Sequence, residues 1–440
     1  MPQSSKQPNK KSFFSRFSIF RRSAKKSTKQ SSAPKKTDTR SSMTHGSGEK
    51  CVCAEKAAKV IGNLAVQLYR NIGQPNENCI FSPASIALAL SLVEPGAGGE
   101  TRKEIQSLLN PSGSNESDST HSFEVLQRQL QIRSQKSNVF ISNGLFYSDK
   151  IHLIDEFQKR IQKLEDSLVQ AQQFGKDPDG CRVRINAWIS KATAGNMPNM
   201  LQKETISDRT VAILVNAVYM KAMWLNEFDD TATLPFYRSG KTELTQNVPF
   251  MLKKSYSGYA ETDMLQVAEL PYDSVPMSMF IILPKKRDGI SELEQWLTSE
   301  KLMMLLKAQP MQPEGFYTPC VALKLPKFTM RKRADLRSIL VTLGVKMMFD
   351  DRIADFSRMV DQASRGCMHV SGALHEAYVK VDEKGTEAAA VTVVEENRPL
   401  SAVRHGRPIP FVADHPFIFA IVHKPMAAIL FLGKVDSVEE

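Results

Sequence analysis

The sequence predicts an α+β fold with large mixed β-sheets, and three observations lead to this prediction. Apolar residues recur at helical spacing in the segments before Val139, whereas β-rich apolar segments dominate after it. Hydrophobic residues make up 42% and charged residues 24% of the 440 residues, which is enough apolar material for a sizeable core. No long linker interrupts the chain from Cys51 onward, so we expect residues 51–440 to form a single large domain.

The first element of that domain is an amphipathic helix of residues 54–72. Its apolar side chains recur three and four residues apart, and Gly73 follows the last of them. A short buried strand then leads into a second helix, for which Ser82 is the N-cap and Pro83 the first residue. That helix is apolar through Val93, so we expect it to be buried.

A glycine-rich run follows at residues 96–101. It lacks the Gly-Lys-Ser/Thr ending of a phosphate-binding loop, and Thr101 stands where a dinucleotide-binding fingerprint has glycine. We therefore interpret the run as a turn between two helices, with Thr101 as the N-cap of the second helix.

The rest of the chain is predicted to be mostly strands, with a few helices between them. Strands are expected at residues 139–147, 268–272, 277–284, 321–328 and 374–381, and helices at residues 156–164, 185–191 and 334–343. The apolar run at residues 211–221 is too rich in β-formers to be assigned to a helix. Residues 417–422 and 427–432 are predicted to form a buried hairpin near the C-terminus.

The segment from Asp382 to Phe417 combines features of a strand and of a loop. Three alanines are followed by Val-Thr-Val-Val, and β-branched residues of this kind suit a half-buried sheet. The second half of the segment is polar and contains Pro399, Pro408 and Pro410, which favour an exposed loop. A segment that can adopt either state is a candidate conformational switch.

The first 50 residues differ from the rest of the chain in charge. They contain 13 Lys and Arg against Asp38 and Glu49, a surplus of 11, which equals the net charge of the whole chain. Because they are rich in Ser and Lys and poor in apolar residues, we predict a basic, disordered N-terminal extension. Three roles are open for this extension: a weak contact with polyanions or a membrane surface, a nuclear-import-like basic cluster, or a solubilising extension. The neutral remainder gives no reason to expect specific nucleic-acid binding.

The six cysteines are too sparse for a disulfide scaffold, and their spacing selects no pairing. Cys51 and Cys53 lack a second Cys/His pair nearby, so no zinc site or other metal centre is expected, and no motif indicates a cofactor. The sequence shows no recognisable signal peptide, which favours reduced thiols and the cytoplasm, with secretion as the alternative.

The sequence offers no catalytic constellation. His375-Glu376 starts like a zinc-protease helix, but the second histidine is missing and the segment is strand-like. No Gly-x-Ser-x-Gly motif of a serine hydrolase occurs. We therefore expect a protein that is not an enzyme.

Several motifs, taken in their order along the chain, resemble the serpin family of serine protease inhibitors. The resemblance extends from about Cys51 to Glu440. The motifs that carry it are Asn78 with Phe81-Ser82-Pro83 and Ser85, Ile185-Asn186 with Trp188, Val215-Asn216-Ala217-Val218-Tyr219 with Lys221 and Trp224, Glu269-Leu270-Pro271-Tyr272, Ser278-Met279, Leu283-Pro284, Leu325-Pro326-Lys327-Phe328, Ala354-Asp355-Phe356-Ser357, His375, Glu383-Lys384-Gly385-Thr386-Glu387-Ala388-Ala389-Ala390, His415-Pro416-Phe417 and Leu430-Phe431-Leu432-Gly433.

The resemblance implies a serpin fold with three β-sheets, eight or nine α-helices and an exposed reactive-centre loop at about residues 383–410. It implies a monomer that acts as a suicide-substrate inhibitor of serine endopeptidases. The protease attacks the loop, and the cut loop then inserts into the main sheet before the covalent acyl-enzyme can be hydrolysed. The alternatives are a non-inhibitory carrier or chaperone and a cross-class inhibitor of cysteine proteases.

The hinge of the reactive loop fits the inhibitory type. The resemblance places the hinge at Glu383, Gly385, Thr386, Ala388, Ala389, Ala390 and Thr392. Alternate residues of an inserting strand point to the core, and on this strand they are small or uncharged, so their burial costs little.

The scissile bond is open between three positions. Leu400-Ser401 ranks first and would suit chymotrypsin-, cathepsin G- or elastase-like proteases. Arg404-His405 ranks second and would suit trypsin-like enzymes, and Arg398-Pro399 ranks third because proteases resist a bond before proline.

A polar cluster beneath the point where the sheet opens is the last feature that the resemblance implies. Its members are Ser82, Ser85, Asn216 and His375. We expect them to be buried with their hydrogen bonds satisfied and to regulate the opening of the sheet.

Overall fold

Three β-sheets and nine α-helices make up the described part of the chain in a computed structural model. The structure describes residues 46–109, 116–130, 136–162, 167–241, 243, 245–307, 319–386 and 407–438. The helices are α2 (Gly46–Ile72), α3 (Pro83–Val93), α4 (Gly99–Leu109), α5 (Glu116–Leu130), α6 (Asp155–Ile161), α7 (Pro178–Ala192), α8 (Ile290–Trp296), α9 (Ser299–Lys307) and α10 (Leu336–Thr342). The predicted α+β class with three sheets is therefore confirmed.

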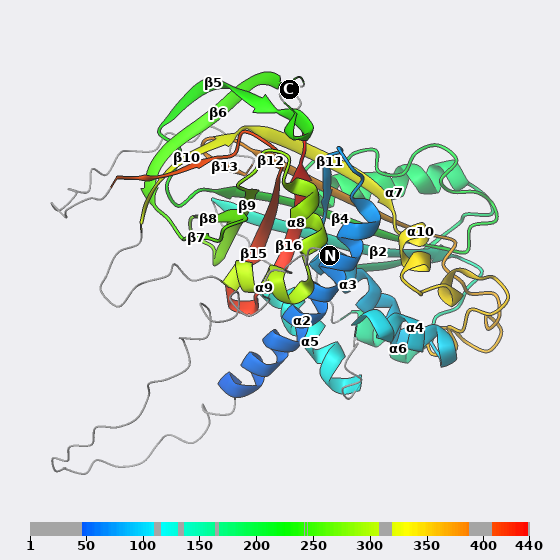
Figure 1. The fold of residues 1–440 in the computed structure, drawn as a ribbon. Coiled ribbons are helices and arrows are strands. Elements are labelled where there is room, and N and C mark those ends of the chain that lie inside the picture. Colours follow the sequence, from blue (N-terminus) through cyan, green and yellow to red (C-terminus); the bar gives the residue numbers. More distant parts are fainter. Residues whose placement is uncertain are drawn as a thin grey trace, which may run out of the picture. The chain divides into compact units, whose positions relative to one another are not determined.

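One six-stranded sheet, called here the closed sheet, contains the last two strands of the chain. Its order is β1 (Cys79–Phe81), β16 (Ala428–Val435), β15 (Phe417–His423), β9 (Met277–Pro284), β8 (Leu265–Pro271) and β7 (Tyr259–Glu261). All neighbours in it are antiparallel. The predicted C-terminal hairpin is confirmed as β15 and β16, which lie side by side in red in Figure 1.

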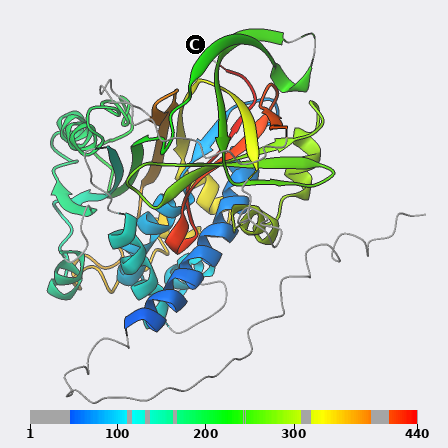
Figure 2. The same cartoon turned by 90° about the vertical axis from the view of Figure 1, so that its left-hand side faces the viewer.

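The second six-stranded sheet, called here the seam sheet, carries the candidate site. Its order is β11 (Phe328–Asp335), β12 (Gly372–Val381), β13 (Gly385–Thr386), β4 (Ala212–Met223), β2 (Ser137–Ser148) and β3 (Ser167–Gln172). A four-stranded sheet has the order β14 (Ile409–Val412), β10 (Cys320–Pro326), β6 (Thr245–Tyr256) and β5 (Asp230–Tyr237). In both views β5 and β6 lie at one end and the helices of the first 130 residues gather toward the other (Figures 1 and 2).

Two hydrophobic cores pack against these sheets. The larger one joins α2 and α3 with the closed sheet, the four-stranded sheet and the inner face of the seam sheet. The smaller one lies between α7 and the outer face of the seam sheet, and it contains Ile185 and Ile189 of α7 together with the β4 residues Val215 and Ala217. The seam sheet is therefore covered on both faces, which explains why β4 is a continuous apolar run rather than an alternating one.

Most predicted elements are present, and the differences have physical reasons. Ser82 caps α3 as expected, because its Oγ accepts a hydrogen bond from Ser85 N at 3.2 Å. The prediction that Thr101 caps α4 is wrong, since the helix already begins at Gly99. The buried Thr101 hydroxyl instead accepts a hydrogen bond from Asp355 N at 3.0 Å. It therefore binds a loop far along the chain rather than capping its own helix.

The predicted helix of residues 334–343 also begins too early. Residues 328–335 form β11, and Asp335 is both the last residue of that strand and the N-cap of α10. Its Oδ1 accepts a hydrogen bond from Arg337 N at 3.1 Å. The sequence does not predict this strand, because only one face of β11 contacts a hydrophobic core and the run Arg331-Lys332-Arg333 makes the segment look polar.

Candidate functional site

The middle of the seam sheet is a junction between two parallel strands, β12 and β4, which we call the seam. Their pairing runs from Gly372 opposite Ile213 to Tyr378 opposite Tyr219. Beyond that point β13 lies between them. Thr386 is opposite Ala222 on one side and Val381 on the other. The seam is thus closed along most of its length and is occupied at one end by the hinge residues Gly385 and Thr386.

The entry point tolerates only specific side chains. A Cβ atom on Gly385 would lie 2.1 Å from the carbonyl oxygen of Ala222, so no other residue fits without moving the backbone of β4. Thr386 is fully buried, and its Oγ1 lies 2.7 Å from Oη of Tyr272. Burial raises the pKa of Tyr272, so the phenol stays protonated and can donate this hydrogen bond. The Trp224 ring stacks on Tyr272 with centroids 4.6 Å apart.

The turn that precedes β13 is held by backbone and side-chain donors of residues 224–228. Trp224 donates from its backbone N to Lys384 O and from Nε1 to Asp382 O, both at 2.9 Å. Phe228 N donates to Glu383 O at 2.9 Å. The hinge is therefore attached to the segment after β4 rather than only to its own strand.

Two carboxylates of this turn have opposite electrostatic environments. Burial raises the pKa of Asp382, although its Oδ1 accepts hydrogen bonds from Lys384 N and Gly385 N, which oppose the rise. A hydrogen bond from Lys327 lowers the pKa of Glu383, whose Oε2 lies 2.7 Å from the Lys327 Nζ. This ion pair connects the hinge to the residue between β10 and β11.

The polar cluster lies under the seam on its inner face, and all its members are fully buried or nearly so. His375 Nε2 accepts a hydrogen bond from Ser82 N at 3.1 Å, so the proton of the neutral ring is on Nδ1. That Nδ1 lies 2.5 Å from Asn216 Oδ1 and donates to it. Asn216 Nδ2 in turn donates to Ser85 O, Ser85 Oγ and Asn143 Oδ1. The cluster connects α3 with three neighbouring strands.

Burial lowers the pKa of His375 to about 3, so the imidazole is neutral at physiological pH. A protonated ring would carry a hydrogen on Nε2 facing the backbone N–H of Ser82. Protonation would therefore break the bond to α3 and bury a charge at the seam.

The structure brings together every predicted site residue that it describes. Glu383, Gly385 and Thr386 form the hinge entry, and the four members of the cluster are in mutual contact. The remaining predicted residues lie outside the described part: Ala388, Ala389, Ala390, Thr392, Arg398, Pro399, Leu400, Ser401, Arg404 and His405.

Four functional contacts were not predicted from the sequence. Asn143 completes the cluster, Tyr272 and Trp224 support Thr386, and Lys327 pairs with Glu383. Tyr272, Trp224 and Lys327 stand within motifs typical of the family, which could have marked them. Nothing in its sequence neighbourhood marks Asn143.

Within the residues that the structure describes, no group of His, Cys, Asp or Glu is arranged to hold a metal ion. The same residues contain no helix that is both long enough and apolar enough to cross a bilayer. The cysteines Cys79, Cys181, Cys320 and Cys367 are unpaired.

Within the described residues, a parallel seam between β12 and β4 thus admits Gly385 and Thr386 at one end. Residues 59–438 match the family described as serpin (serine protease inhibitor). The chain belongs to the serpin family of protease inhibitors and is not an enzyme.

The similar proteins span nearly the whole described chain. Leukocyte elastase inhibitor of Bos taurus is 33% identical over 384 residues, which cover 85% of this chain and 97% of that protein. Serpin B8 of Bos taurus is 32% identical over 382 residues, covering 86% and 98%. The crystal structure of human thyroxine-binding globulin with its hormone superposes with a TM-score of 0.76 at 27% identity, covering 88% of this chain and 100% of that one.

Proposed function

We propose that this serpin is a suicide-substrate inhibitor of serine endopeptidases. The observation that carries the proposal is the position of Gly385 and Thr386, which enter the sheet between β4 and β12 while the seam below them stays closed. In this arrangement the loop after Thr386 acts as bait, and the seam is where that loop goes once it is cut.

The register of the seam supports insertion without a shift of either neighbouring strand. Thr386 is opposite Ala222 and Val381, and the two strands pair with each other in the same register lower down. Continuing this register along both strands brings Thr392 opposite Asn216 and His375. The side chain of Thr392 would then join the polar cluster rather than an apolar surface.

The chemistry needs no catalytic group from the serpin. The protease's serine Oγ attacks the carbonyl carbon of the scissile residue, the peptide C–N bond breaks, and the new amine leaves with the C-terminal fragment. The loop remains bound as an ester. Insertion then adds a full set of strand hydrogen bonds, so the uncut form is held by a kinetic barrier rather than by the lowest free energy.

For the target class we propose Leu400-Ser401 as the scissile bond, with Arg404-His405 second and Arg398-Pro399 third. One of the similar proteins is named an elastase inhibitor, which is compatible with Leu400 at the acyl position. Arg404 would instead select trypsin-like proteases.

A protease panel tests the proposal. The full chain is incubated with chymotrypsin-, elastase-, trypsin- and papain-like enzymes, each product is run on a denaturing gel, and the released C-terminal peptide is weighed by mass spectrometry. We expect a denaturant-resistant complex with a serine protease and a peptide that begins at Ser401. A peptide beginning at His405 or Pro399 would move the scissile bond.

Clean cleavage by every protease, with no complex, would show a non-inhibitory serpin. The likeness to thyroxine-binding globulin makes a carrier the second candidate in that case. A complex with the papain-like enzyme would extend the target class to cysteine proteases.

For the first 50 residues we propose a separate and weaker role as a basic extension that contacts polyanions. We further propose a cytoplasmic monomer, with secretion as the alternative. Removing residues 1–50 should abolish retention on a heparin column and leave complex formation unchanged. Loss of both activities on truncation would refute the separate role.

A further inference from the structure

The segment that follows α7, residues 193–210, covers the outer face of the seam sheet, and we call it the strap. Its buried apolar side chains belong to the smaller core together with the outward-facing residues of β4. The strap residues of that core are Met197, Met200, Leu201 and Ile206, and those of β4 are Ile213, Val215, Ala217 and Tyr219. The partly buried Leu374 and Tyr378 of β12 pack against the same core, so the strap's core spans both sides of the seam.

One side of the strap is fastened to α7. Asn186 donates from Nδ2 to Leu201 O and accepts from Leu201 N, both at 2.8 Å. The helix itself packs on β2, where the Trp188 ring meets the Phe146 ring edge-on at 5.3 Å. These contacts hold the strap to the β4 side of the seam.

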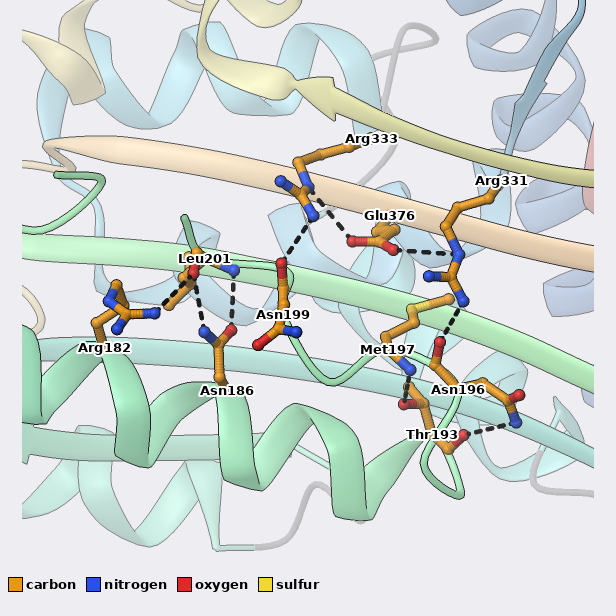
Figure 3. A network of polar contacts seen from close by, with 10 residues as sticks. All are labelled: Arg182, Asn186, Thr193, Asn196, Met197, Asn199, Leu201, Arg331, Arg333 and Glu376. Carbon is orange, nitrogen blue, oxygen red and sulfur yellow. Dashed lines mark hydrogen bonds and ion pairs between the residues drawn. The ribbon is translucent and has the colours of Figure 1, made fainter. Parts of the chain in front are cut away.

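The other side of the strap is fastened to β11, on the far side of the seam. Arg333 Nη2 donates to Asn199 O at 2.8 Å, and Arg331 Nη2 donates to Asn196 O. Figure 3 shows both guanidinium groups reaching from β11 past β12 toward the strap. Both contacts therefore cross the line along which the sheet would open.

The same two arginines flank a buried carboxylate on β12. Glu376 has a side chain that is only 2% exposed, and its oxygens lie 3.4 Å from Arg333 Nε and 3.8 Å from Arg331 Nε. Each guanidinium thus uses Nε toward the carboxylate and Nη2 toward a strap carbonyl. A lysine could balance the charge of Glu376, but it has no second, fixed donor for the carbonyl.

Inserting a strand would separate these contacts selectively. Adjacent strands are about 4.8 Å apart, so a new strand moves β12 and β11 away from β4 by about that distance. Arg331, Arg333 and Glu376 stay together because β11 and β12 remain paired. The bonds to Asn196 O and Asn199 O break, or the strap leaves its contacts with α7.

We propose that Arg331 and Arg333 are positioning residues that clamp the strap across the seam and slow the opening of the sheet. The proposal rests on the proposed insertion mechanism. It assigns part of the barrier that keeps the uncut form trapped to two arginines outside the hinge and outside the polar cluster.

The test compares the full chain with the double variant Arg331→Lys, Arg333→Lys. This variant keeps the positive charges beside Glu376 and removes the guanidinium groups, which bind the carboxylate and a strap carbonyl at the same time. The matched control is Lys332→Arg, because Lys332 lies on the same strand but faces away and pairs with Glu77 at 3.6 Å. A synthetic peptide with the sequence of residues 386–397 is added in excess, and its uptake into the sheet is followed by the rise in thermal resistance. Amide hydrogen exchange of the strap is measured without peptide.

We expect the double variant to take up the peptide about thirty-fold faster, the effect of losing two hydrogen bonds of ordinary strength. The rate of amide hydrogen exchange at residues 196–201 of the double variant should also rise. The Lys332→Arg variant should behave as the unmodified chain in both measurements. The peptide-loaded forms of all three proteins should melt together, because the clamp is already broken in that form.

Three results would overturn the clamp: equal uptake rates, an equal acceleration by Lys332→Arg, or a lower melting temperature of the loaded double variant, which would indicate a general structural role. If neither the unmodified chain nor the variant takes up peptide, the insertion mechanism itself is refuted and the clamp with it. Uptake by the unmodified chain without acceleration in the variant refutes the clamp alone.

Discussion

The two six-stranded sheets of this protein are closed in different ways. In the closed sheet the central strands β9, β15 and β16 are buried along their whole length, and every neighbour is antiparallel. In the seam sheet the central pair is parallel, and polar side chains from α3, β2, β4 and β12 bond to one another directly beneath it. Apolar contact is non-directional and accumulates with area, whereas a polar network is stable only when every partner is present.

A buried histidine in each sheet illustrates the difference. His375 in the seam sheet uses both ring nitrogens in hydrogen bonds. His423 in the closed sheet has an Nδ1 atom that finds no hydrogen-bond partner among the described residues. The seam sheet thus satisfies its buried histidine with specific hydrogen bonds at the place where the proposed insertion would open it, whereas the closed sheet leaves one nitrogen of its buried histidine without a partner among the described residues.

Changing the hinge at the entry to the seam should have the largest effect. Thr386→Arg would bury a charge at a fully buried position, at a cost of several kcal/mol, and would convert the inhibitor into a substrate. Titration against the target protease should show cleaved serpin without covalent complex. Thr386→Ser keeps the hydroxyl that meets Tyr272 and should inhibit normally. An arginine variant that still traps protease at full stoichiometry would refute insertion.

Truncating a core side chain of the closed sheet should weaken the fold without changing the seam. Phe431→Ala on β16 removes a fully buried ring and should lower the free energy of unfolding by about 3–5 kcal/mol. Denaturant unfolding measures this loss, and peptide uptake measures the seam. Faster uptake in proportion to the lost stability would contradict the separation of the two sheets.

Acid should act on the seam through His375. Its pKa is lowered to about 3 in the folded protein against an ordinary value of 6.5, so the neutral ring contributes stability that is complete above pH 6.5. That stability is lost by about 1.4 kcal/mol per pH unit as the pH falls toward 3. We expect peptide uptake to accelerate on acidification, and His375→Gln to remove most of that dependence.

The control for the acid effect is the histidine of the closed sheet. Burial lowers the pKa of His423 to about 4, so this histidine also reduces the stability of the folded protein as the pH falls below 6.5. His423→Gln should change the pH dependence of global unfolding and leave that of peptide uptake intact. If His423→Gln rather than His375→Gln flattens the uptake profile, the seam is not the acid-sensitive site.

The smallest effect is expected at the ion pair between Lys327 and Glu383. Both side chains are about one-third exposed, so solvent and salt screen the pair. Lys327→Gln should cost at most about 1 kcal/mol, and raising the salt concentration should shrink the difference from the unmodified chain. A thermal melt at low and high salt tests this. A larger, salt-independent loss would show that Lys327 also packs structurally against the hinge.

Local patterns were enough to predict most of the single elements. The apolar periodicity of α2 and the Ser82-Pro83 start of α3 depend on residues within one or two turns of each other. The same patterns do not predict the strand β11 and place the start of α10 two residues early, because Arg331 and Arg333 look like solvent-facing residues. They are charged because they face Glu376 and two carbonyl groups, which no local pattern contains.

The sequence by itself determined the family and the chemistry of the hinge, since a glycine, a threonine and three alanines are small whatever surrounds them. Only the tertiary structure decided that β12 and β4 are neighbours and that Thr386 lies between them. It also decided that the hydroxyl groups of Thr386 and Tyr272 are hydrogen-bonded to each other. The physical reason is distance along the chain: Thr386 and Tyr272 are 114 positions apart, and His375 and Asn216 are 159 apart. Periodicity tells which face of a strand is buried, but it does not tell which strand lies beside it.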